Sequence, residues 1–423
     1  METKSTLREN NIFWMRFLFI VAFSLMALSF LFSSPLEVFQ GLKRIITSKS
    51  ILLTDYMEVG NVGSAFFNAG LCTLVACLVV KFSRADISSV VVAGVLNLTA
   101  FCFLGKNIYN IFAPMFGAYL FSRFKREAFK DYVAFALFAT GIGPLISYMT
   151  FEADLPIIAG ILLGNSLGML IGFFLPAVSK NSWNLHQGFT IYNNGFALGI
   201  IYVIFHSVMK MFGLAVENIH LIYMKENLRL FLVFVFMFVG LMVPKLIYSR
   251  SGFAEILAIN KESGKSPCNY IGKYENYAIL FNMGLVGLMG LCYLKIVGAN
   301  INGINLGGVC AVVAFAMYGI NPRNILPIFL GVFLAGHLGH YVVNSESVVI
   351  AALFGTTLAP LAGYYGPLAG VLSGFLHLSL VSKTGLLHDG FHLYNNGFAS
   401  GLVASLLFPI FEALRTRKFK KIK

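Results

Sequence analysis

The chain carries one string twice. It reads HQGFTIYNNGFALG at residues 186–199 and HDGFHLYNNGFASG at residues 388–401. Ten of the fourteen positions are identical, whereas two unrelated segments of that length would share about one residue by chance. A match this dense indicates that a larger unit has been duplicated, because self-similarity at a fixed offset is the mark of repeat architectures.

Weaker matches upstream give the extent of the two copies. FNAGL at 67–71 pairs with FNMGL at 281–285, and smaller matches continue from there to the repeated string. We therefore predict two membrane repeats, residues 12–210 and 225–411, joined head to tail. Residues 412–423 follow as a basic tail that we expect to lie in the cytoplasm.

The composition excludes a water-soluble enzyme and a disordered chain. Hydrophobic residues make up 58% of the 423 residues, charged residues make up 12%, and mean hydropathy is +0.79. A soluble domain is nearer half apolar and about a quarter charged. A helix needs about 20 apolar residues to cross a bilayer, and each copy offers about seven apolar segments. We predict an all-α fold, a polytopic transmembrane helical protein built from two tandem repeats.

An odd number of crossings in each copy would place the two copies in opposite orientations. With both termini in the cytoplasm, most of the 31 Lys and Arg residues fall on the cytoplasmic side, as the positive-inside rule requires. The net charge of +13 is thus an orientation signal, and we expect no nucleic-acid partner. The basic loop 34–63 is the exception, because it faces outward here. We predict inverted repeats in a bacterial plasma membrane, with re-entrant or broken helices at the short segments 108–122 and 325–338.

Inverted repeats recur in transport proteins because two opposed halves create a site between them near the middle of the membrane. Within each string, Asn-Asn-Gly favours a chain break, because Asn and Gly tolerate left-handed backbone. A helix that begins there directs free N–H groups at a ligand, and Asn amides suit a neutral polar solute. The predicted substrate-binding or pathway residues are His186, Phe189, Tyr192, Asn193, Asn194 and Gly195 in the first copy, His388, Phe391, Tyr394, Asn395, Asn396 and Gly397 in the second, and Asn68 and Asn282 in the FNxGL strings.

The FNxGL strings are interpreted as a second chain break in each copy, at Asn68 and Asn282. The alternative for both motifs is structural. Glycines let helices approach closely, and asparagines join neighbouring helices by hydrogen bonds.

Three residues of the second copy are candidates for proton handling: His388, Asp389 and His392. The alternative is that these histidines are hydrogen-bonded packing residues. The first copy has Thr190 where the second has His392, so a shared metal-ligand set is not expected. The six cysteines form no C-x-x-C pair, and we expect neither a metal nor a cofactor.

The duplication and the repeated Tyr-Asn-Asn-Gly string resemble a bacterial family of uncharacterised membrane proteins with a duplicated domain of unknown function. The repeated string is also similar to one found in urea transporters. Those proteins are inverted duplications, and each half carries a His-Gly-aromatic-Asn-Gly string and a re-entrant helix marked by Asn and Gly. The Asn-Pro signature of those transporters is missing here. This second resemblance implies a narrow pathway lined by Phe and by oxygen ligands. It is carried by His186, Gly188, Tyr192, Asn194 and Gly195 and by His388, Gly390, Tyr394, Asn396 and Gly397.

These patterns favour an integral membrane transport protein, a channel or facilitator for a small polar solute. Acidic residues lie almost entirely in loops, which favours a neutral solute over a cation. An ion-coupled transporter working by alternating access stays open, as does a membrane-embedded enzyme or scaffold. No phosphate-binding loop, HExxH or serine elbow occurs, so we expect no enzymatic activity. The expected partners are a small polar solute and membrane lipid, and a homo-oligomer stays open.

Overall fold

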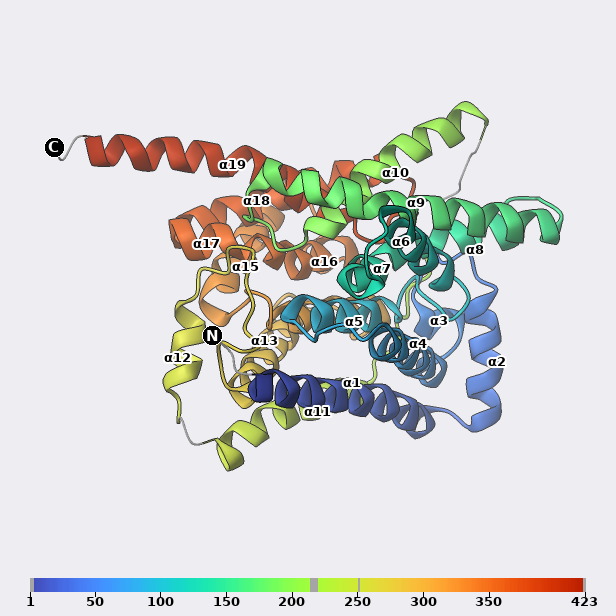
Figure 1. Ribbon diagram of the computed structural model, residues 1–423, viewed down its shortest axis with the longest axis horizontal. Helices are drawn as coiled ribbons and strands as arrows, with labels where there is room; N and C mark the ends of the chain where they lie inside the picture. The colour runs from blue at the N-terminus through green and yellow to red at the C-terminus, as the bar shows by residue number, and fades with distance from the viewer. Residues whose placement is uncertain (1–3, 214–219, 250–251, 421–423) are drawn as a thin grey trace.

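The computed structural model describes residues 4–213, 220–249 and 252–420, which are helical or irregular and contain no named strand (Figure 1). Ten helices in these ranges are long and apolar enough to cross a membrane. The predicted all-α, polytopic membrane fold is therefore confirmed. Both copies build the same series of helices.

The helices of the two copies correspond in order, with α3 the exception. The first repeat contains α1 (Lys4–Phe32), α2 (Pro35–Ile46), α3 (Tyr56–Val59), α4 (Val62–Ser83), α5 (Ser89–Phe101), α6 (Phe112–Lys125), α7 (Val133–Ala139), α8 (Gly143–Phe151), α9 (Ile157–His186) and α10 (Asn193–Met211). The second contains α11 (Leu228–Tyr248), α12 (Ala254–Lys261), α13 (Asn276–Ile296), α14 (Gly303–Phe315), α15 (Pro322–Leu338), α16 (Glu346–Gly355), α17 (Ala359–Tyr365), α18 (Pro367–Thr384) and α19 (Asn395–Lys420).

The two repeats run in opposite directions along the helix bundle. In Figure 1, α1 begins and α19 ends at the left, so both ends of the described chain lie at the same end of the bundle. The short helices α2 and α12 follow the first helix of each repeat, and they lie across opposite ends of the bundle. On the α2 side, Arg44 donates to the carbonyls of Val59 and Gly60. One basic residue of the 34–63 loop therefore stabilises the fold of that same loop.

The helix α19 continues through the predicted tail. It includes residues 412–420, whereas residues 421–423 lie outside the described residues.

The repeated string breaks the chain as expected. Residues before Asn193 and Asn395 are not helical, and α10 and α19 begin at those asparagines. Each break starts with two consecutive left-handed residues, at φ 48° and 82° for Gln187 and Gly188 and at φ 45° and 79° for the equivalent pair. Glycine at the second position allows this reversal without a Cβ clash.

The predicted break at the FNxGL strings is wrong. The helices α4 and α13 run through Asn68 and Asn282 without interruption. The glycines of these strings serve close packing instead: a Cβ on Gly70 would lie 2.7 Å from the carbonyl oxygen of Ala22 on α1. Gly284 is equally tight against α11. Small residues at a helix crossing let two backbones approach, which is how membrane helices associate.

Glycines also set the crossing of α6 with α9 and of α15 with α18. A Cβ on Gly117 would lie 2.0 Å from the carbonyl oxygen of Met169, and a Cβ on Gly331 would lie 2.1 Å from that of Val371. These positions are equivalent in the two repeats. The same backbone contact is therefore built twice.

The repeats are interlocked by reciprocal caps. Asp55 of the first repeat accepts a hydrogen bond from the backbone N–H of Gly303 at 2.9 Å, at the start of α14. Asn269, at the equivalent position of the second repeat, accepts from the N–H of Ser89 at 3.0 Å, at the start of α5. Each repeat thus satisfies free helix-start N–H groups of the other. Backbone bonds also cross between the repeats, among them those from Leu52 to Gly390 at 2.9 Å and from Ser266 to Gly188 at 3.0 Å.

Candidate functional site

The two repeated strings meet where α10 and α19 begin. A Cβ on Gly397 would lie 3.2 Å from Cα of Gly195. Beyond this crossing, Phe398 packs on Gly199 and Phe196 packs on Gly401, so the contact is reciprocal. Two helix starts therefore converge at one point inside the protein, although they lie about half a chain apart in the sequence.

A histidine holds the first asparagine of each string. Nε2 of His186 lies 2.8 Å from Oδ1 of Asn193, and Nε2 of His388 lies 2.9 Å from Oδ1 of Asn395. A hydroxyl supports each pair: Ser182 donates to Asn193 at 3.0 Å, and its counterpart donates to Asn395 at 2.7 Å. These bonds fix the first asparagine and the start of the helix. Both asparagines of each string then line a cavity.

The second asparagines have different partners. Oδ1 of Asn194 accepts from Ser179 at 2.7 Å, whereas Oδ1 of Asn396 lies 3.1 Å from Nε2 of His377. His377 is fully buried on α18. The sequence analysis did not select His377, because the first repeat has Leu175 at the equivalent place and the residue stands alone in an apolar run.

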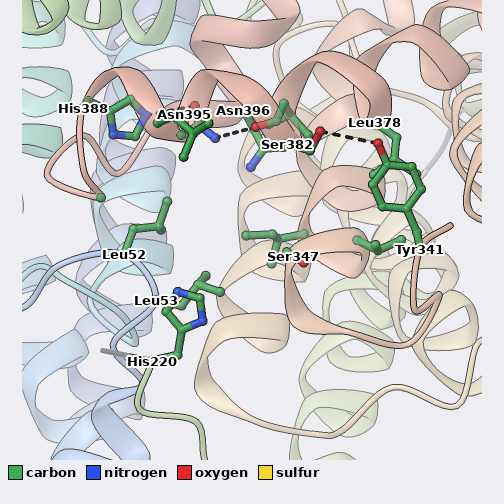
Figure 2. Close-up of a pocket in the computed structure, with 16 residues that line it drawn as sticks. Leu52, Leu53, His220, Tyr341, Ser347, Leu378, Ser382, His388, Asn395 and Asn396 are labelled. Atoms are coloured by element: carbon green, nitrogen blue, oxygen red, sulfur yellow. Dashed lines mark hydrogen bonds between the residues drawn. The ribbon is translucent and has the colours of Figure 1, made fainter. Parts of the chain in front are cut away.

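Each asparagine pair lines one cavity, called the repeat-1 or repeat-2 cavity after the pair, and residues of the other repeat complete its lining. The repeat-1 cavity has a volume of about 390 Å³ and is lined by Asn193, Asn194, Ser179, Lys180, Trp183, Asp131 and Ser266, among others. The repeat-2 cavity has a volume of about 290 Å³. Figure 2 shows His388, Asn395 and Asn396 along one wall of the repeat-2 cavity, across from Leu52, Leu53 and His220. Ser266, which lines the repeat-1 cavity, follows α12, and Leu52, which lines the repeat-2 cavity, follows α2. Because α2 and α12 lie across opposite ends of the bundle, the two cavities lie toward opposite ends as well.

A packed aromatic layer lies at the axis between the repeats. The rings of Tyr192 and Tyr394 have centroids 4.9 Å apart. Tyr394 packs edge-on against Phe101 at 4.9 Å, and Tyr192 packs edge-on against Phe315 at 4.9 Å. The layer consists of Phe101, Phe138, Tyr192, Phe315, Phe354 and Tyr394, each at most 4% exposed. The repeat-1 cavity reaches it at Phe138, Tyr192 and Phe315.

The two tyrosine hydroxyls share polar partners that come from one repeat only. Nδ2 of Asn97 lies 3.0 Å from the hydroxyl of Tyr192 and 3.3 Å from that of Tyr394. The ammonium nitrogen of Lys106 donates to the same Tyr394 hydroxyl. In the second repeat the equivalents of Asn97 and Lys106 are Ala311 and Ile320. This polar cluster therefore breaks the symmetry of the site.

Lys106 is a buried lysine without a carboxylate partner. Its side chain is fully buried, and no ion pair joins it to an Asp or Glu anywhere in the described ranges. Nζ lies 5.1 Å from the ring centroid of Phe101 and 4.8 Å from that of Tyr394. Lys106 was not among the predicted site residues, although a lysine opposite Ile320 in the aligned repeats is a visible signal.

Asn68 and Asn282 stabilise the turns after α5 and α14. Nδ2 of Asn68 donates to the carbonyls of Cys102 and Lys106 at 2.8 and 2.9 Å. Asn282 makes the equivalent bonds to Ala316 and Ile320 at 2.7 and 2.8 Å. Neither amide lines either cavity. Asn68 instead holds the backbone that carries Lys106.

The predicted phenylalanines pack beside the strings. Phe189 stacks on Tyr365 with centroids 5.1 Å apart, and Phe391 packs edge-on against Tyr148 at 4.8 Å. Neither residue lines either cavity. They wedge the non-helical residues that precede α10 and α19 against neighbouring helices.

The proton-handling candidates occupy different environments. Asp389 pairs with His206 at 3.0 Å and with Lys210 at 3.1 Å, near the end of α10. His388 holds Asn395 and lines the repeat-2 cavity. His392 is fully buried, and neither of its ring nitrogens has a hydrogen-bond partner among the residues that the structure describes. Thr190, its counterpart, is bonded to Ser400 at 3.2 Å.

The site is thus assembled from equivalent positions of two copies of one domain. The family model described as "Protein of unknown function (DUF1576)" matches residues 34–211 and again residues 248–413. The chain belongs to this family. The double match confirms the predicted duplication, and each DUF1576 domain contributes one histidine–asparagine pair and one tyrosine to the site. No curated protein and no solved structure matches the chain.

Proposed function

We propose that this protein transports a small polar solute across the membrane along a pathway between its two repeats. The observation that carries the proposal is the pair of cavities at opposite ends of the bundle, each lined by the asparagines of one repeat. Pseudo-twofold sites between inverted repeats are the recurrent plan of secondary transporters.

The polar groups of the cavities favour an uncharged or weakly charged solute. Asn amides both donate and accept hydrogen bonds, so they can bind carbonyl, hydroxyl and amide groups alike. Free N–H groups at the starts of α10 and α19 add donors directed at the centre. Urea, glycerol and small neutral amino acids are therefore the first solutes to test. The protein is proposed to act in the plasma membrane with both termini in the cytoplasm, without enzymatic activity.

The aromatic layer favours alternating access over a permanently open channel. The rings of Tyr192 and Tyr394 are in contact, and the six rings of the layer are buried. A solute of even a few heavy atoms cannot pass between rings at that separation. Movement of one repeat against the other would expose the centre to one cavity and then to the other.

The test is solute uptake into proteoliposomes that contain the purified full-length protein. Asn194→Ala and Asn396→Ala should each reduce uptake about ten- to hundred-fold, because an unpaired buried polar group costs about 1–3 kcal/mol. Asn181→Ala is the matched control, since Asn181 is exposed on α9 and bonds only to its own helix. Monodisperse elution checks that each variant is folded.

Two outcomes would overturn the proposal. If both alanine variants take up solute at the wild-type rate, the asparagines join helices and do not line the pathway. If the wild-type protein moves no solute of the panel faster than empty liposomes do, transport itself is rejected.

A further inference from the structure

The second repeat contains a column of titratable groups that leads from its cavity to Lys106. His388 lines the repeat-2 cavity, and its ring centroid lies 5.5 Å from that of His392. The ring of His392 lies 5.9 Å from that of Tyr394. The hydroxyl of Tyr394 accepts a hydrogen bond from Lys106. Four titratable side chains thus follow one another from the cavity to the aromatic layer.

The nitrogens within this column have unused hydrogen-bonding capacity. Nδ1 of His388 and both ring nitrogens of His392 have no partner in the described protein, and the hydroxyl of Tyr202 beside them has none. Buried polar groups in native proteins are nearly always paired with protein or water. A cluster of unpaired groups at these separations fits a path on which a water molecule bridges successive side chains.

The equivalent column in the first repeat is interrupted. Thr190 replaces His392, Ile320 replaces Lys106, and Ala404 replaces Tyr202. Thr190 and Ile320 cannot take up or release a proton near neutral pH. Both repeats nevertheless keep the histidine–asparagine pair and the tyrosine. The titratable groups are therefore not a requirement of the fold, which is built without them in the other copy.

A permanent charge at Lys106 would be costly. An uncompensated ammonium in a low-dielectric interior loses several kcal/mol of solvation, and no carboxylate among the described residues offsets this loss. The faces of Phe101 and Tyr394 give partial compensation through cation–π contacts. A lysine in such a place is suited to gain and lose a proton, which arginine is not.

We propose that Lys106 is a proton-binding site that exchanges protons with the repeat-2 side through Tyr394, His392 and His388. An incoming proton binds His388, passes through bridging water to His392, and reaches the phenolic oxygen of Tyr394. Tyr394 releases its own O–H proton to the amine of Lys106, which becomes an ammonium. One proton is bound overall, and no other bond changes.

The titratable groups that face this path come from several elements. Lys106 lies beside Tyr394, Cys72 and Cys102. His392 lies beside His388 and Tyr202. Beyond Tyr202 lie His206, Asp389 and Lys210. Asp389 and Lys210 are partly exposed at the surface. Asp389 is paired with His206, which packs against Tyr202, so this group of side chains connects the column to bulk solvent at a second place.

The role of this site in a coupled cycle rests on the proposed transport function, but proton binding at Lys106 does not. The experiment therefore needs no solute. Proteoliposomes with the full-length protein are adsorbed to a solid-supported membrane, and the transient current that follows a step to mildly acidic buffer is recorded. Wild type should give a current, because a proton moves from the buffer into the protein interior.

Three variants test the path. Lys106→Ile should lose the current while staying folded, because isoleucine is accommodated at the equivalent position of the second repeat. Lys106→Arg should also lose it, since arginine keeps its proton. His392→Thr should slow the current, as threonine is accommodated at the equivalent position of the first repeat. His337→Gln is the control, because His337 is exposed on α15 away from the path.

The outcomes separate the possibilities. A wild-type current in folded Lys106→Ile overturns the proposal. A wild-type current in Lys106→Arg overturns it too, because a residue with a permanent charge would then suffice at position 106. Loss in both lysine variants, with a normal His337→Gln, supports it. If the current behaves as expected but no solute is taken up, the proton site stands and the transport function fails.

Discussion

The two repeats share the glycine crossings and reciprocal caps that join their helices, and they differ in which residues are polar at their centre. Both use glycines at the α6–α9 and α15–α18 crossings, and both cap the other repeat's short central helix. Only the first repeat supplies Asn97 and Lys106, and only the second supplies His392. A position that is polar in one copy and apolar in the other is free of any demand of the shared fold. Such positions mark function more sharply than the repeated string does.

The largest expected effect tests the part of the comparison that is symmetric. Gly117→Val and Gly331→Val should each abolish folded protein, because the new Cβ would lie 2.0 or 2.1 Å from a backbone carbonyl oxygen. Displacing backbone should exceed the about 1–3 kcal/mol typical of an overpacked core. The measurement is the yield of monodisperse protein.

Gly240→Val is the control for this pair, since no atom lies within 4 Å of a Cβ on Gly240. If one of the two variants folds and the other does not, the repeats do not pack equivalently.

The next effect comes from exchanging the residues at the two equivalent central positions. Ile320→Lys should lower the free energy of unfolding by about 3–5 kcal/mol, because it buries an unpaired charge. Lys106→Ile should raise it by about 1–4 kcal/mol, since it removes a buried polar group whose charged form is costly. Thermal unfolding of the purified variants measures both. A lower melting temperature for Lys106→Ile would mean that Lys106 stabilises the fold, against the view that it serves function.

A smaller effect separates the two tyrosines. Tyr394→Phe leaves Lys106 without its hydrogen-bond partner and should cost about 1–3 kcal/mol. Tyr192→Phe removes bonds to Asn97 and Tyr394 and should cost about 1 kcal/mol, because Asn97 and Tyr394 keep each other as partners. Thermal unfolding of both variants under identical detergent conditions gives the ranking. Equal costs would show that the lysine contact contributes little.

The last effect concerns the reciprocal caps and depends on pH. Burial raises the pKa of Asp55 to about 7, although N–H groups of Met57 and Gly303 oppose the rise. The folded protein then holds a proton that the unfolded chain has lost, so stability should fall as pH rises from about 4 to about 7. Asp55→Asn, which installs the residue found at the equivalent Asn269, should flatten this profile. Melting temperatures across that pH range provide the check, and an unchanged slope would contradict it.

Much of the architecture could be predicted from the sequence because its signals are local. The repeated string marks the starts of α10 and α19, since Asn and Gly before an apolar run permit a left-handed reversal. The chain break predicted at the FNxGL strings was wrong for a related reason. Asparagine beside glycine also occurs inside continuous helices, where the glycine admits a neighbouring helix and the amide reaches a distant turn.

The centre of the site could not be predicted by the same means. The partners of Lys106 and Asn97 lie far away in the chain, on Tyr394, and no spacing rule connects them. The unpaired nitrogens of His392 depend on which side chains surround it after folding. Comparing the two copies position by position would have singled out these residues, although it would not have shown that they meet.

The reciprocal caps have a consequence for how the protein is made. Ser89, at the start of α5, receives its cap from Asn269, which the ribosome adds 180 residues later. The first repeat must therefore wait in the bilayer with that helix start unfinished until the second repeat arrives. We therefore expect each half alone to leave one central helix start uncapped, so a nascent chain stalled between the repeats would be a target for quality-control proteases. Two half-chains synthesised together could still complete each other, because both reciprocal caps join one half to the other.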